Sequence, residues 1–230
     1  MDPRTLPPDI IPLYERLRHT YAVGFEPVRL GDLRLHLLRI TDIEPLLGGK
    51  NPLEDVSAFP FWVKLWESSL VLAQMLATQP AGEGRSLLEL GAGLGLPGLA
   101  AAARGWQVTL SDFEDLILDF QQVNVAANRL AGVECRMLDW LAPGDLPRYD
   151  CVIGAEILFR DTFFEPLLAV FRQALKPGGV IYLAHEQDRQ SLAPFLALAE
   201  KEYVIGCQRR TLKAIGGDKT ILLNRLVPRA

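Results

Sequence analysis

The 230-residue chain has few of the side chains that build disulfide or metal sites. Its three cysteines, Cys135, Cys151 and Cys207, are widely separated and odd in number, which is typical of reduced thiols in a cytosolic protein. The three histidines are equally scattered, and no Cys or His pair has the short spacing of a zinc site. We therefore expect neither a disulfide framework nor a metal centre.

The sequence also lacks a long apolar run and an excess of positive charge. No segment approaches the roughly 20 apolar residues of a membrane span, and the start, M-D-P-R-T-L-P-P-D, is acidic and proline-broken where a secretion signal would be basic and then apolar. The 24 basic and 28 acidic side chains give a net charge of −4, which does not supply the phosphate attraction of a dedicated nucleic-acid binder. We expect a soluble cytoplasmic protein with no membrane or nucleic-acid partner.

The first 59 residues predict an extension that packs on a core domain spanning residues 60–230. Residues 9–19 have the pattern of a short amphipathic helix, and Val28–Ile40 alternates around a Gly-Asp pair as a β-hairpin does. The breaker G-G-K-N-P, Gly48–Pro52, follows. The pattern leaves open whether the hairpin covers a site, docks a partner or only stabilises the fold.

Strands and helices alternate from residue 86 onward, after a helical pattern that begins at Trp66. Such alternation is typical of an α/β protein with a Rossmann-like, doubly wound sheet that is mostly parallel. Two closing segments, 202–212 and 220–227, flank a G-G-D turn and predict an antiparallel C-terminal hairpin, which brings the sheet to seven strands. The other strands are expected at 86–90, 106–112, 133–139, 149–156 and 180–185, and helices at 96–104, 113–130 and 163–175.

The stretch L-L-E-L-G-A-G-L-G-L-P-G, residues 87–98, contains two overlapping glycine registers. Gly91, Gly93 and Gly95 form E-x-G-x-G-x-G behind Glu89, whereas a register ending at Gly98 matches the G-x-G-x-x-G of dinucleotide-binding enzymes. Glycines between a strand and a helix let backbone approach a ligand closely, although they also close ordinary tight turns. The loop alone does not identify a cofactor.

Acidic residues at the ends of the next two strands narrow the choice of cofactor. Asp112 ends the second strand, where a carboxylate can accept hydrogen bonds from ribose hydroxyls, and Asp139 ends the third, where one can receive the adenine amine. Each residue alone is an ordinary strand end or helix cap, but together they describe an adenosine site. A pyrophosphate would disfavour the carboxylate of Glu89, whereas a sulfonium cation favours carboxylates and aromatic faces. We therefore favour S-adenosylmethionine over NAD.

At this point the sequence resembles the class I, seven-β-strand S-adenosylmethionine-dependent methyltransferases. The matching segments are E-L-G-A-G-L-G (89–95), L-S-D-F (110–113), L-D-W (138–140), D-C-V-I-G-A-E (150–156) and L-K-P-G-G (175–179). The resemblance implies that Gly91, Gly93 and Gly95 pass beneath the cofactor and that Glu89 supports its methionine end. It further implies that Asp112 binds the ribose. The same resemblance places Phe113, Asp139, Trp140 and Ala155 around the adenine and the rest of the cofactor, and implies S-adenosylhomocysteine as product.

The segment P-F-W-V-K-L-W, residues 60–66, is similar to one that precedes the glycine loop in the small protein-lysine methyltransferases, including those that act on the electron-transfer flavoprotein β subunit. That likeness implies that Trp66 lies against the cofactor. Those enzymes usually have Asp-x-x-Tyr after the fourth strand, where this chain has Glu156 and Phe159. The change adds one methylene and removes a hydroxyl, so the acceptor class stays open.

The leading hypothesis is a methyltransferase that N-methylates lysine in a protein substrate. Glu156 would orient the lysine ammonium, and the apolar Phe159 and Trp66 would help its proton to leave, because only about one lysine in 10³ to 10⁴ is neutral at pH 7. The alternatives are a small-molecule N- or O-methyltransferase and a non-catalytic module that kept the cofactor fold. The segment H-E-Q-D-R, residues 185–189, either lines the acceptor mouth or is a solvated loop.

Overall fold

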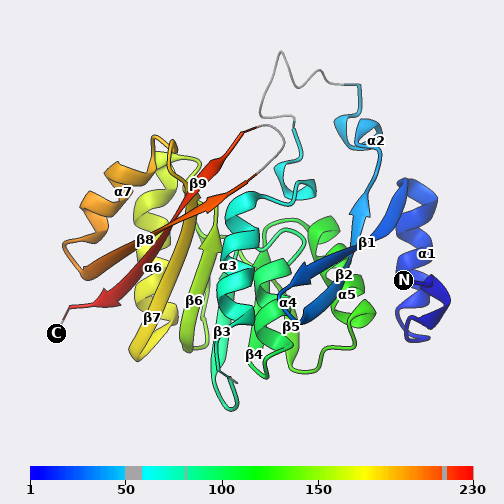
Figure 1. Cartoon of the computed structure of the whole chain (residues 1–230), viewed down its shortest axis with the longest axis horizontal. Coiled ribbons are helices and arrows are strands. Elements are labelled where there is room, and N and C mark those ends of the chain that lie inside the picture. The colour runs from blue at the N-terminus through cyan, green and yellow to red at the C-terminus, as the bar shows by residue number, and fades with distance from the viewer. Residues whose placement is uncertain (50–58, 81, 214–216, 230) are drawn as a thin grey trace.

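The computed structural model describes residues 1–49, 59–80, 82–213 and 217–229. Figure 1 shows a large twisted sheet with helices on both sides, and a small two-stranded sheet beside one group of these helices. This is the Rossmann-like α/β architecture that the alternation of strands and helices predicted. Within the described ranges, no helix is both long and apolar enough to cross a membrane.

The large sheet has the strand order β5-β4-β3-β6-β7-β9-β8. Neighbours from β5 to β7 are parallel, whereas β9 runs antiparallel to both β7 and β8. The predicted closing hairpin is thereby confirmed. Because the chain order reverses between β3 and β6, the carboxyl ends of these two strands border the place where such sheets bind ligands. The strands are β3 (Ser86–Leu90), β4 (Gln107–Asp112), β5 (Val133–Met137), β6 (Tyr149–Ala155), β7 (Leu175–Glu186), β8 (Tyr203–Leu212) and β9 (Lys219–Pro228).

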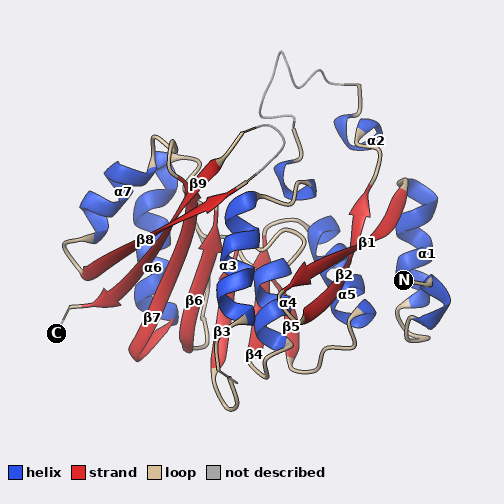
Figure 2. Ribbon diagram, in the orientation of Figure 1, coloured by secondary structure: helices blue, strands red, loops and turns tan. Residues whose placement is uncertain are grey.

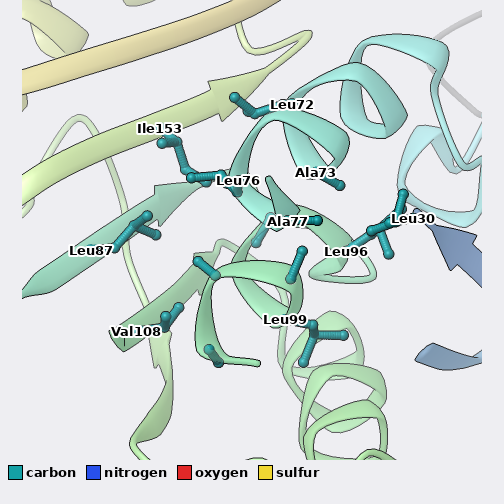
Figure 3. Close-up of a cluster of buried hydrophobic side chains, with 14 of the residues drawn as sticks. Leu30, Leu72, Ala73, Leu76, Ala77, Leu87, Leu96, Leu99, Val108 and Ile153 are labelled. Carbon is teal, nitrogen blue, oxygen red and sulfur yellow. The ribbon is translucent and has the colours of Figure 1, made fainter. Parts of the chain in front are cut away.

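Helices cover both faces of this sheet (Figure 2). Alternate strand residues belong to different buried clusters. Leu87 of β3 joins the cluster around α3 and α4, whereas Leu88, the next residue, joins the cluster around α6 and α7. In Figure 3, Leu72 and Leu76 of α3 turn toward Ile153 and Leu87 of the sheet. Burial on both faces explains why the central strands are apolar throughout. The helices are α3 (Glu67–Ala77), α4 (Leu96–Ala102), α5 (Asp115–Ala127), α6 (Phe164–Ala174) and α7 (Leu192–Ala199).

The N-terminal elements pack against the helices on one side of the sheet. Helix α1 (Ile11–Thr20) lies against α5, and the hairpin of β1 (Val23–Leu30) and β2 (Leu33–Ile40) lies against α3, α4 and α5. Leu30 of β1 belongs to the same buried cluster as Leu96 of α4. The hairpin and its Gly-Asp turn were predicted correctly, and its first strand begins five residues earlier than expected.

Two features differ from the sequence-based expectations. Helix α7 was not predicted, because the run L-A-P-F-L-A-L-A is almost wholly apolar and shows no helical periodicity. The K-P-G-G segment was expected to stop a helix before the fifth strand, but it lies inside the longer β7. A short helix, α2 (Glu44–Leu47), ends before the predicted breaker Gly48–Pro52, of which only the first two residues lie in the described part of the chain.

Candidate functional site

A cavity of about 920 Å³ opens at the carboxyl ends of β3, β4, β5 and β6. Its volume is near the upper end of the ~300–1,000 Å³ typical of ligand pockets. Side chains predicted from separate motifs meet here, because the carboxyl ends of parallel strands share one edge of the sheet. All the predicted site residues line this cavity: Trp66, Glu89, Gly91, Gly93, Gly95, Asp112, Phe113, Asp139, Trp140, Ala155, Glu156 and Phe159.

The glycine-rich loop between β3 and α4 forms one wall of the cavity. Gly91, Gly93 and Gly95 have φ angles of 58°, 53° and 81°, in the left-handed region that favours glycine. Gly98 has a different function, because it lies in the first turn of α4 and a Cβ atom there would sit 2.6 Å from the Glu89 carboxylate. The first three glycines therefore shape the loop, and Gly98 lets the helix pack close to the sheet.

Glu89 is a buried carboxyl group at the cavity wall, with 1% of its surface exposed. Its Oε2 accepts a 2.7 Å hydrogen bond from the backbone N–H of Gly98. Burial raises the pKa of Glu89 to about 8, the Gly98 bond lowers it in part, and the nearby charge of Asp112 adds to the rise. The site therefore favours a protonated Glu89 until a positive group arrives.

Asp112, at the end of β4, organises the loop from the other side. Its Oδ2 accepts a 2.8 Å hydrogen bond from the N–H of Gly93, and its Oδ1 accepts one of 2.8 Å from Phe113. Burial raises the pKa of Asp112 to about 6, against the lowering effect of these two bonds. The ring of Phe113 is 63% exposed at the cavity wall, so it is free to stack on a flat ligand group.

Asp139 and Trp140 follow β5 at the same edge. The Oδ1 of Asp139 accepts a 2.8 Å hydrogen bond from the Leu141 N–H, which leaves its second oxygen free of any partner among the described residues. The ring of Trp140 lies 5.5 Å from that of Phe163 and 6.1 Å from that of Phe159, centroid to centroid. This aromatic group forms the wall that joins the β5 and β6 ends of the cavity.

These residues fit S-adenosylmethionine. Within the described ranges, neither Glu89 nor Asp112 forms an ion pair, and both have raised pKa values because they are buried without a positive partner. A ligand with a sulfonium and an ammonium group supplies the missing positive charge. The glycine loop and the exposed Phe113 ring match the remaining, flat and polar parts of such a ligand.

The aromatic segment before α3 forms the opposite wall. The indole N–H of Trp66 donates a 3.0 Å hydrogen bond to the Phe61 carbonyl, and the Lys64 ammonium lies 4.1 Å from the centroid of the Trp66 ring. Trp62 packs on Phe120 of α5 with ring centroids 5.1 Å apart. Both tryptophans line the cavity, Trp62 from a 3₁₀ turn and Trp66 from the N-cap of α3.

Glu156 is held by three donors and is not a free carboxylate. Its Oε1 accepts a 2.7 Å hydrogen bond from the Glu186 N–H, and its Oε2 accepts one of 2.9 Å from Arg189 Nε and another from Arg189 Nη2. Only 7% of the Glu156 side chain is exposed, against 29% for Arg189. Two Arg189 nitrogens thus donate to the single oxygen Oε2, so the negative charge of Glu156 is compensated where it borders the cavity.

Arg189 is the site residue that the sequence did not single out. The sequence did not decide whether the segment H-E-Q-D-R lines the cavity. In the structure Arg189 lines the cavity, whereas His185 is fully buried and does not. The His185 Nε2 accepts a hydrogen bond from the Leu158 N–H, and burial lowers the pKa of His185 to about 3. Arg189 lies just beyond the end of β7, and this position was the sequence signal that could have identified it as a site residue.

Comparison with known proteins agrees with this geometry. Residues 54–202 match the profile of a family described as lysine methyltransferase. The protein N-lysine methyltransferase METTL21A of Xenopus tropicalis is 33% identical over 147 residues, which cover 61% of this chain and 68% of that protein. EEF1A lysine methyltransferase 3 of Mus musculus is 36% identical over 129 residues, which cover 53% of this chain and 54% of that protein.

A third relative has a different name. Histone-arginine methyltransferase METTL23 of Mus musculus is 32% identical over 138 residues, covering 55% of this chain and 54% of that protein. The chain thus spans little more than half the length of two of these relatives. The named relatives therefore include both lysine and arginine as acceptors.

Solved structures share the fold at low sequence identity. A precorrin-6y C5,15-methyltransferase from Geobacter metallireducens has a TM-score of 0.58 at 18% identity, covering 74% of this chain and 92% of that one. A Pyrococcus abyssi tRNA (uracil-54, C5)-methyltransferase in complex with S-adenosyl-L-homocysteine has a TM-score of 0.57 at 18% identity, covering 88% of this chain and 44% of that one. Since the family profile matches more than half of the chain, this protein belongs to the lysine methyltransferase family, and it shares its fold with these solved methyltransferases.

Proposed function

We propose that this protein transfers a methyl group from S-adenosylmethionine to the side-chain nitrogen of a lysine in another protein. One observation carries the proposal: a single cavity extends from the glycine loop to the wall formed by Glu156, Phe159 and Arg189. A cofactor on the loop and a side chain entering along that wall would therefore meet in the same space. The names of the lysine-specific relatives support this acceptor.

The residues of the loop and strand ends would hold the cofactor, which supplies an activated methyl group on a sulfonium. Gly91, Gly93 and Gly95 would leave room for it, and Glu89 and Asp112 would offset its positive charge and bind its ribose. When bound, the cofactor would supply its methyl group to the neutral lysine nitrogen, so that a nitrogen–carbon bond forms as the sulfur–carbon bond breaks and leaves a thioether. The one proton that the lysine gives up would go to water before the transfer, and the product would be a methylammonium. The protein contributes alignment and a site that excludes water.

Arg189 would help the lysine to lose its proton beforehand. A free carboxylate at Glu156 would stabilise the lysine ammonium and raise its pKa, which opposes transfer. The Arg189 guanidinium cancels this effect by pairing with Glu156, and it also lies in the cavity as a positive charge that disfavours a second one. The half-exposed ring of Phe159 adds an apolar surface for the lysine methylenes.

Glu156 would therefore act mainly by holding Arg189 and the loop after β6 in place. Its effect on the acceptor would be indirect, through Arg189. This modifies the role expected from the sequence, in which Glu156 contacts the ammonium directly. The change follows from its three hydrogen bonds, which occupy both carboxylate oxygens.

The experiment is methyl transfer from labelled S-adenosylmethionine to a proteome extract, followed by mass spectrometry of each labelled band. We expect label on lysine Nε in protein, and loss of label with Asp112→Ala. Label that enters only a protein-free metabolite pool would instead establish the small-molecule N- or O-methyltransferase. Cofactor binding without transfer to either pool would favour a non-catalytic module.

A second acceptor, arginine, is favoured by a separate observation. One relative carries the name of a histone-arginine methyltransferase. The same mass spectrometry distinguishes the two acceptors, because methylated arginine and methylated lysine give different fragments.

A further inference from the structure

Three amide side chains form a polar row on one face of α5. Gln121, Asn124 and Asn128 are spaced by three and four residues, so they follow one another along the helix surface. Gln121 and Asn124 have no exposed surface, and none of the three lines the cavity. Buried amides are costly unless they are hydrogen-bonded, so the partners of this row indicate what it does.

The first two amides hold the glycine loop. Gln121 Nε2 donates a 3.1 Å hydrogen bond to the Gly93 carbonyl, and Asn124 Nδ2 donates one of 3.1 Å to the Leu94 carbonyl. On its other side the Gly93 N–H is bonded to Asp112. Side chains from α5 and β4 thus fix consecutive peptide units in the middle of the loop.

Fixing these carbonyls also fixes the N–H groups of the same peptides. In a trans peptide the N–H and C=O point in opposite directions, so the bond from Gln121 to the Gly93 carbonyl sets the direction of the Leu94 N–H. That N–H has no hydrogen-bond partner within the described residues, and Leu94 lines the cavity. The shape of the cofactor wall therefore depends on residues that do not touch the cofactor.

The last two amides hold the N-terminal hairpin. Asn124 Oδ1 accepts a 2.6 Å hydrogen bond from the Leu38 N–H, while Asn128 accepts one of 2.8 Å from the His36 N–H and donates one of 2.8 Å to its carbonyl. Strand β2 pairs with β1 on one edge only, so these amides satisfy its other edge, which would otherwise be open.

Asn124 therefore joins the two regions through a single amide group. Its oxygen accepts from the hairpin and its nitrogen donates to the glycine loop. The reverse orientation would place a donor against the Leu38 N–H and an acceptor against the Leu94 carbonyl, so it is excluded. One side chain thus connects the edge of β2 with the Leu94 carbonyl. No residue of β1 or β2 lines the cavity itself.

We propose that Gln121 and Asn124 are positioning residues for S-adenosylmethionine binding, and that Asn124 makes the N-terminal hairpin a structural part of the cofactor site. Because such coupling is reciprocal, cofactor binding also stabilises the hairpin. This answers the question that the sequence left open, since the hairpin acts on the site from behind the loop and does not cover the cavity.

The helix offers a matched pair of variants one turn apart. Asn124→Asp and Asn128→Asp make the same chemical change, and each retains the oxygen that accepts from the hairpin. Asn124→Asp replaces the donor to the Leu94 carbonyl by an acceptor, whereas Asn128→Asp alters only contacts outside the glycine loop. By calorimetry with S-adenosylhomocysteine we expect about 10-fold weaker binding for Asn124→Asp and unchanged binding for Asn128→Asp.

A third variant covers the case in which Asn124→Asp does not fold. Gln121→Met keeps the side-chain volume, removes the donor to Gly93 and leaves the hairpin untouched, and we expect it to weaken S-adenosylhomocysteine binding by about 5-fold. Thermal unfolding of the free proteins separates lost affinity from lost stability. Unchanged affinity in folded Asn124→Asp or Gln121→Met, or an equal loss in Asn128→Asp, would overturn the proposal.

Hydrogen exchange tests the coupling from the other end. In the wild-type protein, S-adenosylhomocysteine should slow exchange of the amides of residues 33–40, and Asn124→Asp should remove this response while Asn128→Asp retains it. Exchange in this segment that does not respond to S-adenosylhomocysteine in the wild type would refute the coupling. Because these measurements need no methyl acceptor, they are independent of whether lysine is the substrate.

Discussion

The cofactor side and the acceptor side of the cavity treat their carboxyl groups in opposite ways. On the cofactor side, Glu89 and Asp112 are buried without a positive partner within the described residues, and their pKa values are raised. On the acceptor side, Glu156 is paired with Arg189 and with a backbone N–H. The first arrangement has carboxyl groups that a cationic ligand can ionise, whereas the second already contains its cation. We infer that the cofactor side of the cavity attracts a positively charged group and that the acceptor side disfavours one.

The largest expected effect comes from Asp112→Ala. This variant removes the acceptor of the Gly93 N–H and the carboxylate proposed to bind the ribose, so S-adenosylhomocysteine affinity should fall at least about 100-fold. Calorimetry measures the loss. Asp115→Ala is the control, because Asp115 is exposed in the first turn of α5 and does not line the cavity. An equal effect of both variants would assign the loss to general surface charge.

The second effect is a fall in thermal stability with rising pH, which bound S-adenosylmethionine should counteract. Because the pKa of Asp112 is raised to about 6 and that of Glu89 to about 8, their contribution to stability is fully present below their ordinary values and is lost as pH rises through about 6 and 8. The melting temperature of the free protein should therefore fall between about pH 5 and 8. The stabilisation by S-adenosylmethionine should grow over the same range, since a cation favours the ionised carboxylates.

Thermal unfolding at several pH values, with and without S-adenosylmethionine, makes this measurement. Glu89→Gln should flatten the upper part of the pH profile, because it cannot ionise but keeps an oxygen to accept from the Gly98 N–H. A free protein whose melting temperature rises over this range would contradict the electrostatic description of the cofactor side.

A smaller effect is expected on the acceptor side from Arg189→Gln. Removing the guanidinium leaves Glu156 as an uncompensated negative charge, which should raise the pKa of an incoming lysine and move the rise of the transfer rate upward by about one pH unit. The pH profile of methyl transfer to the substrate found in the extract provides the measurement. Arg160→Gln is the matched control, because Arg160 lines the cavity but makes no ion pair within the described residues.

The smallest effect is expected for Asp139→Asn, about 3- to 10-fold in S-adenosylhomocysteine affinity. One of its oxygens already accepts from the Leu141 N–H, so only the other is available to a ligand. Affinity measured by calorimetry should fall far less than for Asp112→Ala. A larger loss for Asp139→Asn would mean that the adenine end dominates cofactor binding.

The cofactor side could be predicted from sequence because its residues end successive parallel strands. Once β3, β4 and β5 were recognised from their apolar runs, the geometry of a parallel sheet placed Glu89, Asp112 and Asp139 at one edge. The glycine register was also determined locally, since Gly91, Gly93 and Gly95 have positive φ and Gly98 does not. Local pattern and sheet geometry placed these three acids, whereas Phe113, Trp140 and Ala155 were added by the resemblance to a known family.

The acceptor side could not be predicted in the same way. Glu156 and Arg189 lie 33 residues apart and meet only because β6 and β7 are adjacent, and no periodicity in the sequence shows that they pair. The row of amides on α5 escaped prediction for a similar reason. The hairpin partners of Asn124 and Asn128 lie more than 80 residues earlier in the chain, so no local pattern shows these contacts.

The backbone at Glu156 has a consequence of its own. Its φ is 56°, a conformation that costs a glutamate roughly 1–3 kcal/mol and a glycine almost nothing. Replacing Glu156 by glycine should relieve that strain while removing the anchor of Arg189. A chain that retains glutamate here gives up folding free energy at the end of β6 and gains the contact that holds Arg189 at the cavity.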